Sequence, residues 1–328
     1  SSPGILRMFS FIIALVAACS VHETSAEDPS WLISRPVTPW PKLSPADNTA
    51  IFPEIMELSL KDTMGSNDGE FIDVTEHFFW NMQGGIVIEM GAFDGITHSS
   101  SYPLEKHFGW KRILIEGNPI HREELKKQDS SFCALAVVCD EPRTVHYATN
   151  SKIGEVTAGV VEFMNPIFLH WAHRHVYNAA TVNSDKSMNF SNVDWKILPK
   201  VHEVACVTMD TILQTAGVVH IDLFILDVEG AEPVIIQSLL KYQDRIKFNI
   251  LCIEVQTPQK IDEVKTLFAS TPYEFVALKG RNIFYKHKDF VPIKRPGLHK
   301  RCYRGSIASG VNRRDPDQLS CKHNELLL

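Results

Sequence analysis

From about residue 85 to residue 286, short apolar runs alternate with amphipathic stretches along the chain. The apolar runs are rich in β-branched residues and bounded by glycine or acidic residues, a pattern typical of buried strands. We predict strands at residues 85–92, 112–116, 132–138, 221–228 and 248–255, and a closing hairpin at 275–278 and 283–286. The amphipathic stretches predict helices at 101–108, 119–127, 234–242 and 261–268. Strands that alternate with helices at this spacing predict an α/β fold, a Rossmann-like, doubly wound and mostly parallel sheet with a C-terminal antiparallel hairpin.

The N-terminal segment predicts a targeting signal. Arg7 precedes an uncharged apolar run at residues 9–19, and Thr24-Ser25-Ala26 offers small residues for cleavage before Glu27. The run is shorter than the roughly 20 residues that a spanning helix needs. We expect a signal peptide, and hence an address in the secretory pathway, in the Golgi lumen or outside the cell. A short uncleaved anchor, which would be the only membrane contact, is the first alternative, and an upstream translated segment before Met8 is the second.

Composition divides the remaining chain into regions. Residues 27–50 are rich in Pro, Ser and Trp, which is typical of an extended linker or stem, and short helices are expected at 51–60 and 75–82. Residues 150–200 interrupt the strand–helix rhythm, so we interpret them as an insertion that forms a lid or a substrate platform. The expected organisation is a signal at 1–26, a stem with helices at 27–83, the main domain at 84–290 with its insertion at 150–200, and a basic, loosely ordered tail at 291–328.

The net charge says little about binding partners, and the cysteines say little about the cellular compartment. A net charge of -6 does not favour nucleic acid as a partner. The six cysteines after Cys19 permit disulfides without assigning them. Cys206 and Cys252 lie in apolar runs and are expected to be buried free thiols, whereas Cys302 and Cys321 could tie down the tail. The sequon Asn189-Phe190-Ser191 would be glycosylated only in a lumenal protein.

The first candidate for chemistry follows the first core strand, at Glu89-Met90-Gly91-Ala92-Phe93-Asp94-Gly95. Its small residues allow a sharp turn and a close approach of a ligand to the backbone, and an acid at a strand end can bind the ammonium or hydroxyl groups of a nucleoside or amino acid. The segment lacks the full G-x-G-x-x-G pattern, so a nicotinamide oxidoreductase is the less favoured interpretation.

Two further acids end the next two strands. Glu116 lies 25 residues beyond Gly91, close to the spacing at which Rossmann-type sites hold a ribose diol. Asp140, after the third strand, is placed to reach an adenine edge, with a surface turn as the equal alternative.

The third candidate is Asp227-Val228-Glu229-Gly230-Ala231-Glu232, where three carboxylates follow a central strand. Open α/β sheets bind ligands at this edge. Glu254 ends the next strand, so Asp227 and Glu254 could hold a divalent cation such as Mg²⁺, or one of them could act as a base; helix capping by Glu229 and Glu232 is the alternative. The insertion adds candidate bases, since imidazole titrates near neutral pH. These are His170, His173 and His175.

Three of these segments, in order, resemble the FkbM family of methyltransferases. They are V-I-E-M-G-A-F-D-G, G-W-K-R-I-L-I-E-G-N-P and I-D-L-F-I-L-D-V-E-G-A-E, and the resemblance spans about residues 84–257. It implies a class I methyltransferase fold, S-adenosylmethionine as the donor, and methylation of hydroxyl oxygens, often on sugars. This chain has Phe93 where many bacterial members have Asn.

The resemblance also implies roles for particular residues. Glu89, Gly91 and Gly95 would line the methionine and ribose portion of the donor, with Asp94 in the same loop. Glu116 would hold the ribose hydroxyls, and Asp227 with Glu229 would lie beside the reacting centre.

We therefore expect an in-line transfer from S-adenosylmethionine to a hydroxyl of a glycan or small molecule, with a catalytic set of Asp227, Glu229 and His173. A catalytically inactive lumenal protein that keeps this fold as a binding or trafficking adaptor is the alternative. The sequence leaves the acceptor and the oligomeric state open.

Overall fold

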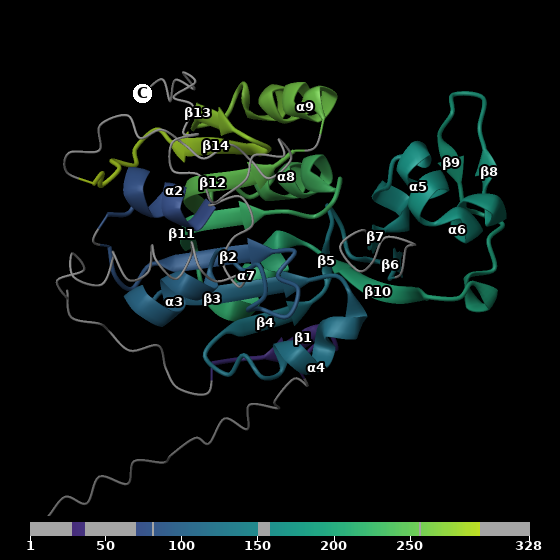
Figure 1. Cartoon of the computed structure of the whole chain (residues 1–328), viewed down its shortest axis with the longest axis horizontal. Coiled ribbons are helices and arrows are strands. Elements are labelled where there is room, and N and C mark those ends of the chain that lie inside the picture. Colours follow the sequence, from purple (N-terminus) through teal and green to yellow (C-terminus); the bar gives the residue numbers. More distant parts are fainter. Residues whose placement is uncertain (1–27, 37–69, 81, 150–157, 256, 296–328) are drawn as a thin grey trace, which may run out of the picture.

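The computed structural model describes residues 28–36, 70–80, 82–149, 158–255 and 257–295 (Figure 1). The expected signal, the helix at 51–60 and the tail beyond residue 295 lie outside these ranges, as do Cys302 and Cys321. Within them, no helix has the length and apolar character required to cross a membrane.

An eight-stranded sheet forms the centre of the molecule, in the order β1-β4-β3-β2-β11-β12-β14-β13. Its five middle strands, β4 to β12, run parallel, whereas β1 and the hairpin β13–β14 pair antiparallel to their neighbours. The strands are β1 (Leu32–Ser34), β2 (Ile86–Met90), β3 (Lys111–Glu116), β4 (Phe132–Leu135), β11 (His220–Leu226), β12 (Lys247–Glu254), β13 (Tyr273–Lys279) and β14 (Asn282–His287). The predicted α/β fold with a C-terminal hairpin is confirmed.

Helices cover both faces of this sheet because its buried strands alternate side chains between two cores. Phe224 and Leu226 of β11 belong to one core, and Leu223 and Ile225 to the other. The first core is covered by α7 (Met209–Ala216), α8 (Glu232–Leu240) and α9 (Pro258–Phe268), and the second by α2 (Glu70–His77) and α3 (Tyr102–Phe108). A short 3₁₀ turn, η1 (Pro119–His121), and α4 (Arg122–Leu125) follow β3.

The helix predicted at 75–82 is wrong in its bounds. Helix α2 begins at Glu70 and ends at His77; Phe71 and Val74 on its buried face pack in the same core as Phe78, which directly follows it. Beyond it, Phe79 forms a β-bridge with Ile293, and the Trp80 amide donates to the Ile293 carbonyl at 2.9 Å. This bridge removes the last predicted residues from the helix.

The insertion contains a second sheet, of order β5-β10-β6-β7, and a small helical lobe (Figure 1). We call residues 143–207 the insertion module; it is wider than the predicted 150–200 because β6 and β10 belong to it. Its elements are β6 (Arg143–Ala148), β7 (Gly159–Val160), η3 (Val161–Phe163), α5 (Pro166–Ala172), α6 (Arg174–Ala179), β8 (Thr181–Val182), β9 (Met188–Asn189), η4 (Trp195–Ile197) and β10 (Val201–Val207), and β5 (Val137–Val138) joins it to the main domain. The lobe projects away from the main sheet in Figure 1.

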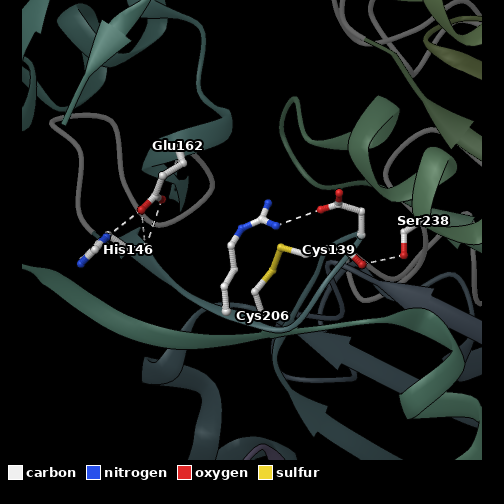
Figure 2. Close-up of a disulfide and its surroundings, with 7 residues drawn as sticks. Cys139, His146, Glu162, Cys206 and Ser238 are labelled. Carbon is white, nitrogen blue, oxygen red and sulfur yellow. Dashed lines mark hydrogen bonds and ion pairs between the residues drawn. A yellow bond between two sulfur atoms is a disulfide. The ribbon is translucent and has the colours of Figure 1, made fainter. Parts of the chain in front are cut away.

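A disulfide between Cys139 and Cys206 ties the module to the main domain (Figure 2). Strand β10 runs parallel to β5 and brings the two Cα atoms to 5.6 Å, a normal disulfide separation. The expectation of a free thiol at Cys206 is therefore wrong, whereas Cys252 is buried and free as predicted. The Ser238 hydroxyl of α8 donates to the Cys139 carbonyl at 2.6 Å, which joins a third element to this point.

Candidate active site

A cavity of about 590 Å³ opens at the carboxyl edge of the central strands β2, β3, β11 and β12. In a parallel sheet, this edge is where the side chains that follow each strand converge. Acids dominate its polar lining: Glu70, Glu89, Glu116, Asp227, Glu229 and Glu254. Four of these follow or end four different strands, so the pattern of acids predicted from the sequence meets in one space.

Gly91 lines the cavity where the ends of β2 and β11 come into close contact. It adopts a φ of 83°, and a β-carbon there would overlap the backbone carbonyl oxygen of Asp227. The Asp227 amide in turn donates to the Met90 carbonyl at 3.1 Å. The ends of β2 and β11 therefore approach to a distance that glycine alone allows, and Gly91 remains exposed in the cavity lining.

Glu89 organises the loop that follows. Its carboxylate accepts hydrogen bonds from the Ser99 and Ser101 hydroxyls, both at 2.5 Å, and from the Ser100 amide at 2.7 Å. Three donors hold the carboxylate in place, and they leave one of its approximately four acceptor positions for a ligand. Glu89 is thus fixed at the cavity wall as well as in a position to bind a cationic group.

Glu116 sits at the end of β3 with both carboxylate oxygens engaged by the backbone. The Phe93 amide donates to Oε2 at 2.7 Å, and the Asn118 amide donates to Oε1 at 2.6 Å. Burial nevertheless raises the pKa of Glu116 to about 7, against the lowering effect of these hydrogen bonds. The Gly117 amide is a third backbone donor to this carboxylate, so one of its approximately four acceptor positions remains for a ligand hydroxyl.

The loop at Asp94 and Gly95 supports this wall from behind and is outside the cavity lining. Asp94 accepts from the Ile96 and Thr97 amides at 2.8 and 2.6 Å, and these bonds with the Thr97 hydroxyl lower its pKa against the raising effect of burial. The fully buried Arg112 donates to the Gly95 carbonyl at 2.6 Å and pairs with Glu105 at 2.6 Å. Hydrogen bonds and an ion pair within the protein therefore fix the shape of this loop.

Asp227 and Glu254 form a carboxyl pair on the opposite wall. Burial raises the pKa of Asp227 well above its usual range, and the charge of Glu254 and a side-chain hydrogen bond to it raise it further. Two adjacent carboxyl groups retain a proton between them, because the negative charge of one disfavours ionisation of the other. Glu254 also pairs with Arg281.

Glu229 lies beside this pair in a constrained turn. Its φ of 54° lies in the left-handed region that non-glycine residues seldom adopt, and Gly230 follows at 113°. Lys260 of α9 fixes the turn from outside, since its ammonium donates to the Gly230 carbonyl and lies 3.4 Å from the Glu232 carboxylate. Backbone strain of this kind accumulates at functional sites.

Two of the predicted site residues lie elsewhere. Asp140 is at the surface, where it pairs with Arg143 at 2.8 Å and Lys241 at 3.6 Å, in keeping with the surface-turn alternative. His173 is fully buried at the junction of α5 and α6 and is not among the described residues that line the cavity. The other two histidines of the module, His170 and His175, are likewise outside that lining.

Several residues of the lining carried no signal in the sequence. Glu70 comes from α2 and accepts from the Asn282 amide group of the hairpin at 2.6 Å, so both are brought in by long-range packing. Tyr147 reaches the cavity from the insertion module. Phe93 and His121 of the lining also contact each other, with ring centroids 4.0 Å apart.

No group of three or more His, Cys, Asp or Glu side chains arranged to hold a metal ion occurs in the part of the chain that the structure describes. The pair predicted for a divalent cation, Asp227 and Glu254, is joined by a hydrogen bond.

The strand order identifies the class of fold. From β4 to β12 it is the 3-2-1-4-5 order of a Rossmann-type sheet, and the antiparallel β14 between β12 and β13 makes it a class I methyltransferase fold. The model of the Methyltransferase FkbM domain matches residues 89–275. The chain belongs to this family of methyltransferases, which implies S-adenosylmethionine as the donor.

Two solved structures are similar to the chain at low identity. The methyltransferase FkbM of Methylobacillus flagellatus KT is 11% identical over 74% of this chain and 60% of its own, with a TM-score of 0.38. The precorrin-6y C5,15-methyltransferase of Geobacter metallireducens GS-15 is 10% identical over 62% of this chain and 79% of its own, with a TM-score of 0.29. The chain thus spans about 60% of the length of the FkbM structure. No curated protein matches it.

The residues present fit this donor. The cavity lies within the roughly 300–1,000 Å³ range of small-molecule sites. The exposed backbone at Gly91 and one remaining acceptor position on each of Glu89 and Glu116 match an amino acid joined to a nucleoside.

Proposed function

We propose that this chain is an S-adenosylmethionine-dependent O-methyltransferase that acts on a hydroxyl of a glycan or small molecule in the secretory pathway. The observation that carries the proposal is the carboxyl pair of Asp227 and Glu254, which lines the same cavity as the donor residues Glu89 and Glu116. Methylation of a hydroxyl releases a proton, and this pair offers a place for it.

Each residue then has a defined task. When bound, S-adenosylmethionine supplies an electrophilic methyl group. Glu89 and Glu116 hold and orient the donor, which accounts for much of the rate in a transfer that depends on alignment. The carboxylate form of Asp227 would accept the proton as the acceptor's O–H bond breaks; the acceptor oxygen would bond to the methyl carbon while the methyl–sulfur bond breaks and the donor leaves as the neutral thioether S-adenosylhomocysteine. A positively charged ligand beside the pair favours this carboxylate form.

The charge of the cavity supports a neutral acceptor with hydrogen-bond donors over an anionic one. Carboxylates are hydrogen-bond acceptors, so they bind hydroxyl groups and repel phosphate or sulfate. Six acids in the lining therefore favour a neutral, hydroxyl-bearing acceptor such as a sugar.

The secretory address is supported by the Cys139–Cys206 disulfide, because disulfides persist in oxidising compartments. Asn189 of the sequon lies in β9, and its side-chain oxygen accepts from the Ser191 amide at 2.9 Å and hydroxyl at 2.7 Å. Expression in animal cells tests the address: enzymatic removal of N-glycans should shift the wild type and leave Asn189→Gln unshifted, whereas an unglycosylated, reduced protein would contradict it.

Methyl transfer is tested with donor labelled in its methyl group, incubated with the full chain and a fraction of neutral oligosaccharides and glycoproteins. We expect labelled methylated monosaccharides after acid hydrolysis, and at least a hundredfold less label with Asp227→Asn, in keeping with the roughly 10²–10⁴-fold contribution of a positioned base. Label recovered in amino acids would contradict O-methylation of sugars. A Lys106→Gln variant, changed on an exposed part of α3, controls for preparation.

A further inference from the structure

Tyr147 is the point at which the insertion module enters the cavity. Its ring packs against the backbone of Gly117, where a β-carbon would lie 2.6 Å from Cε2 of the tyrosine. Gly117 directly follows Glu116, the acid to which the proposed function assigns the ribose of the donor. The aromatic ring therefore adjoins the nucleoside end of the proposed donor site.

The neighbouring residue fixes which way this strand faces. Successive side chains of a strand point to opposite faces. His146 is held on the outer face by Glu162, whose carboxylate accepts from the His146 amide at 3.1 Å and lies 2.7 Å from Nδ1 (Figure 2). Trp195 stacks on the same imidazole with ring centroids 3.7 Å apart. Because the His146 side chain is held against Glu162 and Trp195 on one face of β6, the Tyr147 side chain points from the other face, toward the cavity.

The disulfide fixes where the strand lies. Strand β10 pairs with β6, placing His202 opposite Tyr147, and it pairs with β5 of the main domain at Cys206. The Cys139–Cys206 bond closes this junction covalently. The tyrosine is thus positioned through β10 by a cross-link several residues along the strand.

The surroundings keep Tyr147 as a neutral hydroxyl. Burial raises its pKa well above the usual value, and the charges of Glu116 and Glu229 raise it further. Its hydroxyl accordingly lies near both carboxylates, and it has no hydrogen-bond partner among the residues that the structure describes. A protonated phenol at a cavity wall is available to donate to a ligand.

We propose that Tyr147 is a donor-binding residue supplied by the insertion module, that its hydroxyl donates a hydrogen bond to the nucleoside of the methyl donor, and that the Cys139–Cys206 disulfide holds it in place. This inference rests on the proposed function and deepens it. The module is then a wall of the donor site, in addition to any contact with the acceptor.

Calorimetric titration of the full chain with S-adenosylhomocysteine tests the inference. Tyr147→Phe keeps the ring and its contact with Gly117 and removes only the hydroxyl. We expect a Kd about fivefold weaker, the value of one neutral hydrogen bond. Tyr177→Phe makes the same chemical change in α6, where the ring contacts His170 outside the cavity, and should leave Kd unchanged.

A double-mutant cycle tests the role of the disulfide. Replacing both cysteines, Cys139→Ala with Cys206→Ala, should weaken binding in the Tyr147 background and have little further effect in Tyr147→Phe. Should the cysteine variant fail to fold, titration of the folded wild type before and after mild reduction gives the same comparison.

The outcomes separate the two proposals. Equal Kd values for the wild type and Tyr147→Phe would overturn this inference while leaving the donor site intact. Additive losses in the cycle would overturn the part assigned to the disulfide. Absence of binding by the folded wild type would overturn the proposed function, and this inference with it.

Discussion

Gly91 and the backbone carbonyl of Asp227 lie so close together that no side chain fits between them. The contact joins the end of β2, which carries Glu89, to the end of β11, which Asp227 directly follows. A backbone contact therefore fixes the distance between Glu89, which we assign to the methyl donor, and Asp227, which we assign to the reaction.

Gly91→Ala should separate these strand ends. Overpacking costs about 1–3 kcal/mol, so we expect that loss of stability in urea unfolding and at least a tenfold loss of S-adenosylhomocysteine affinity. Gly217→Ala is the matched control, since Gly217 has a similar φ of 71° but no atom within 4 Å of an added β-carbon. It should lose stability through backbone strain alone and bind normally. Normal binding by Gly91→Ala would contradict the role of this contact.

Donor binding should depend on pH through Glu116. Its pKa of about 7 means that the carboxylate, the form that accepts charge-assisted hydrogen bonds from a diol, predominates only above this pH. Affinity should rise about tenfold from pH 6 to pH 8 and then level off. Glu116→Gln should bind more weakly and show no such rise. A wild-type affinity that is flat across this range would argue against Glu116 as the diol acceptor.

Asp227→Asn should stabilise the fold at neutral pH while it abolishes methyl transfer. The raised pKa of Asp227 means that the folded state binds its proton more tightly than the unfolded state. Wild-type stability therefore falls as pH rises through and above the ordinary pKa of an aspartate, and the amide removes this loss. Unfolding at pH 5 and pH 8 should show the variant's advantage growing with pH. A variant that is less stable at pH 8 would contradict a proton shared between Asp227 and Glu254.

Arg112 should be far more important for stability than an exposed arginine. Its guanidinium is fully buried, paired with Glu105 and bonded to the Gly95 carbonyl. Arg112→Met leaves Glu105 without its partner and should cost about 3–5 kcal/mol. Arg143→Gln removes a surface pair with Asp140 and should cost about 1 kcal/mol or less. Similar losses of unfolding free energy for the two variants, measured in urea, would contradict the role of Arg112 in holding the loop at Asp94 and Gly95.

Local pattern was sufficient for the parallel strands and for the acids at their ends, but not for β1, which lies in the segment predicted as a linker or stem. Each parallel strand reads as an apolar run, and Glu89, Glu116 and Asp227 follow directly from where three of those runs end. Because parallel strands end at one edge, sequence position translated directly into spatial proximity for these three residues.

The rest depended on long-range packing that a single sequence does not encode locally. Cys139 and Cys206 are 67 residues apart, and only the parallel pairing of β10 with β5 makes them partners. Tyr147 faces the cavity because of the register of β6 in the second sheet, and the pattern of apolar residues in the sequence did not predict this register. His173 was attractive by residue type, yet the core of its own module buries it.

The central claim is that this cavity is a donor site, and titration of the full chain with S-adenosylmethionine and, separately, with NAD tests it most directly. We predict micromolar binding of S-adenosylmethionine, its loss in Glu116→Ala, and no binding of NAD. A folded chain that binds neither ligand would contradict the account and favour an inactive, methyltransferase-fold adaptor.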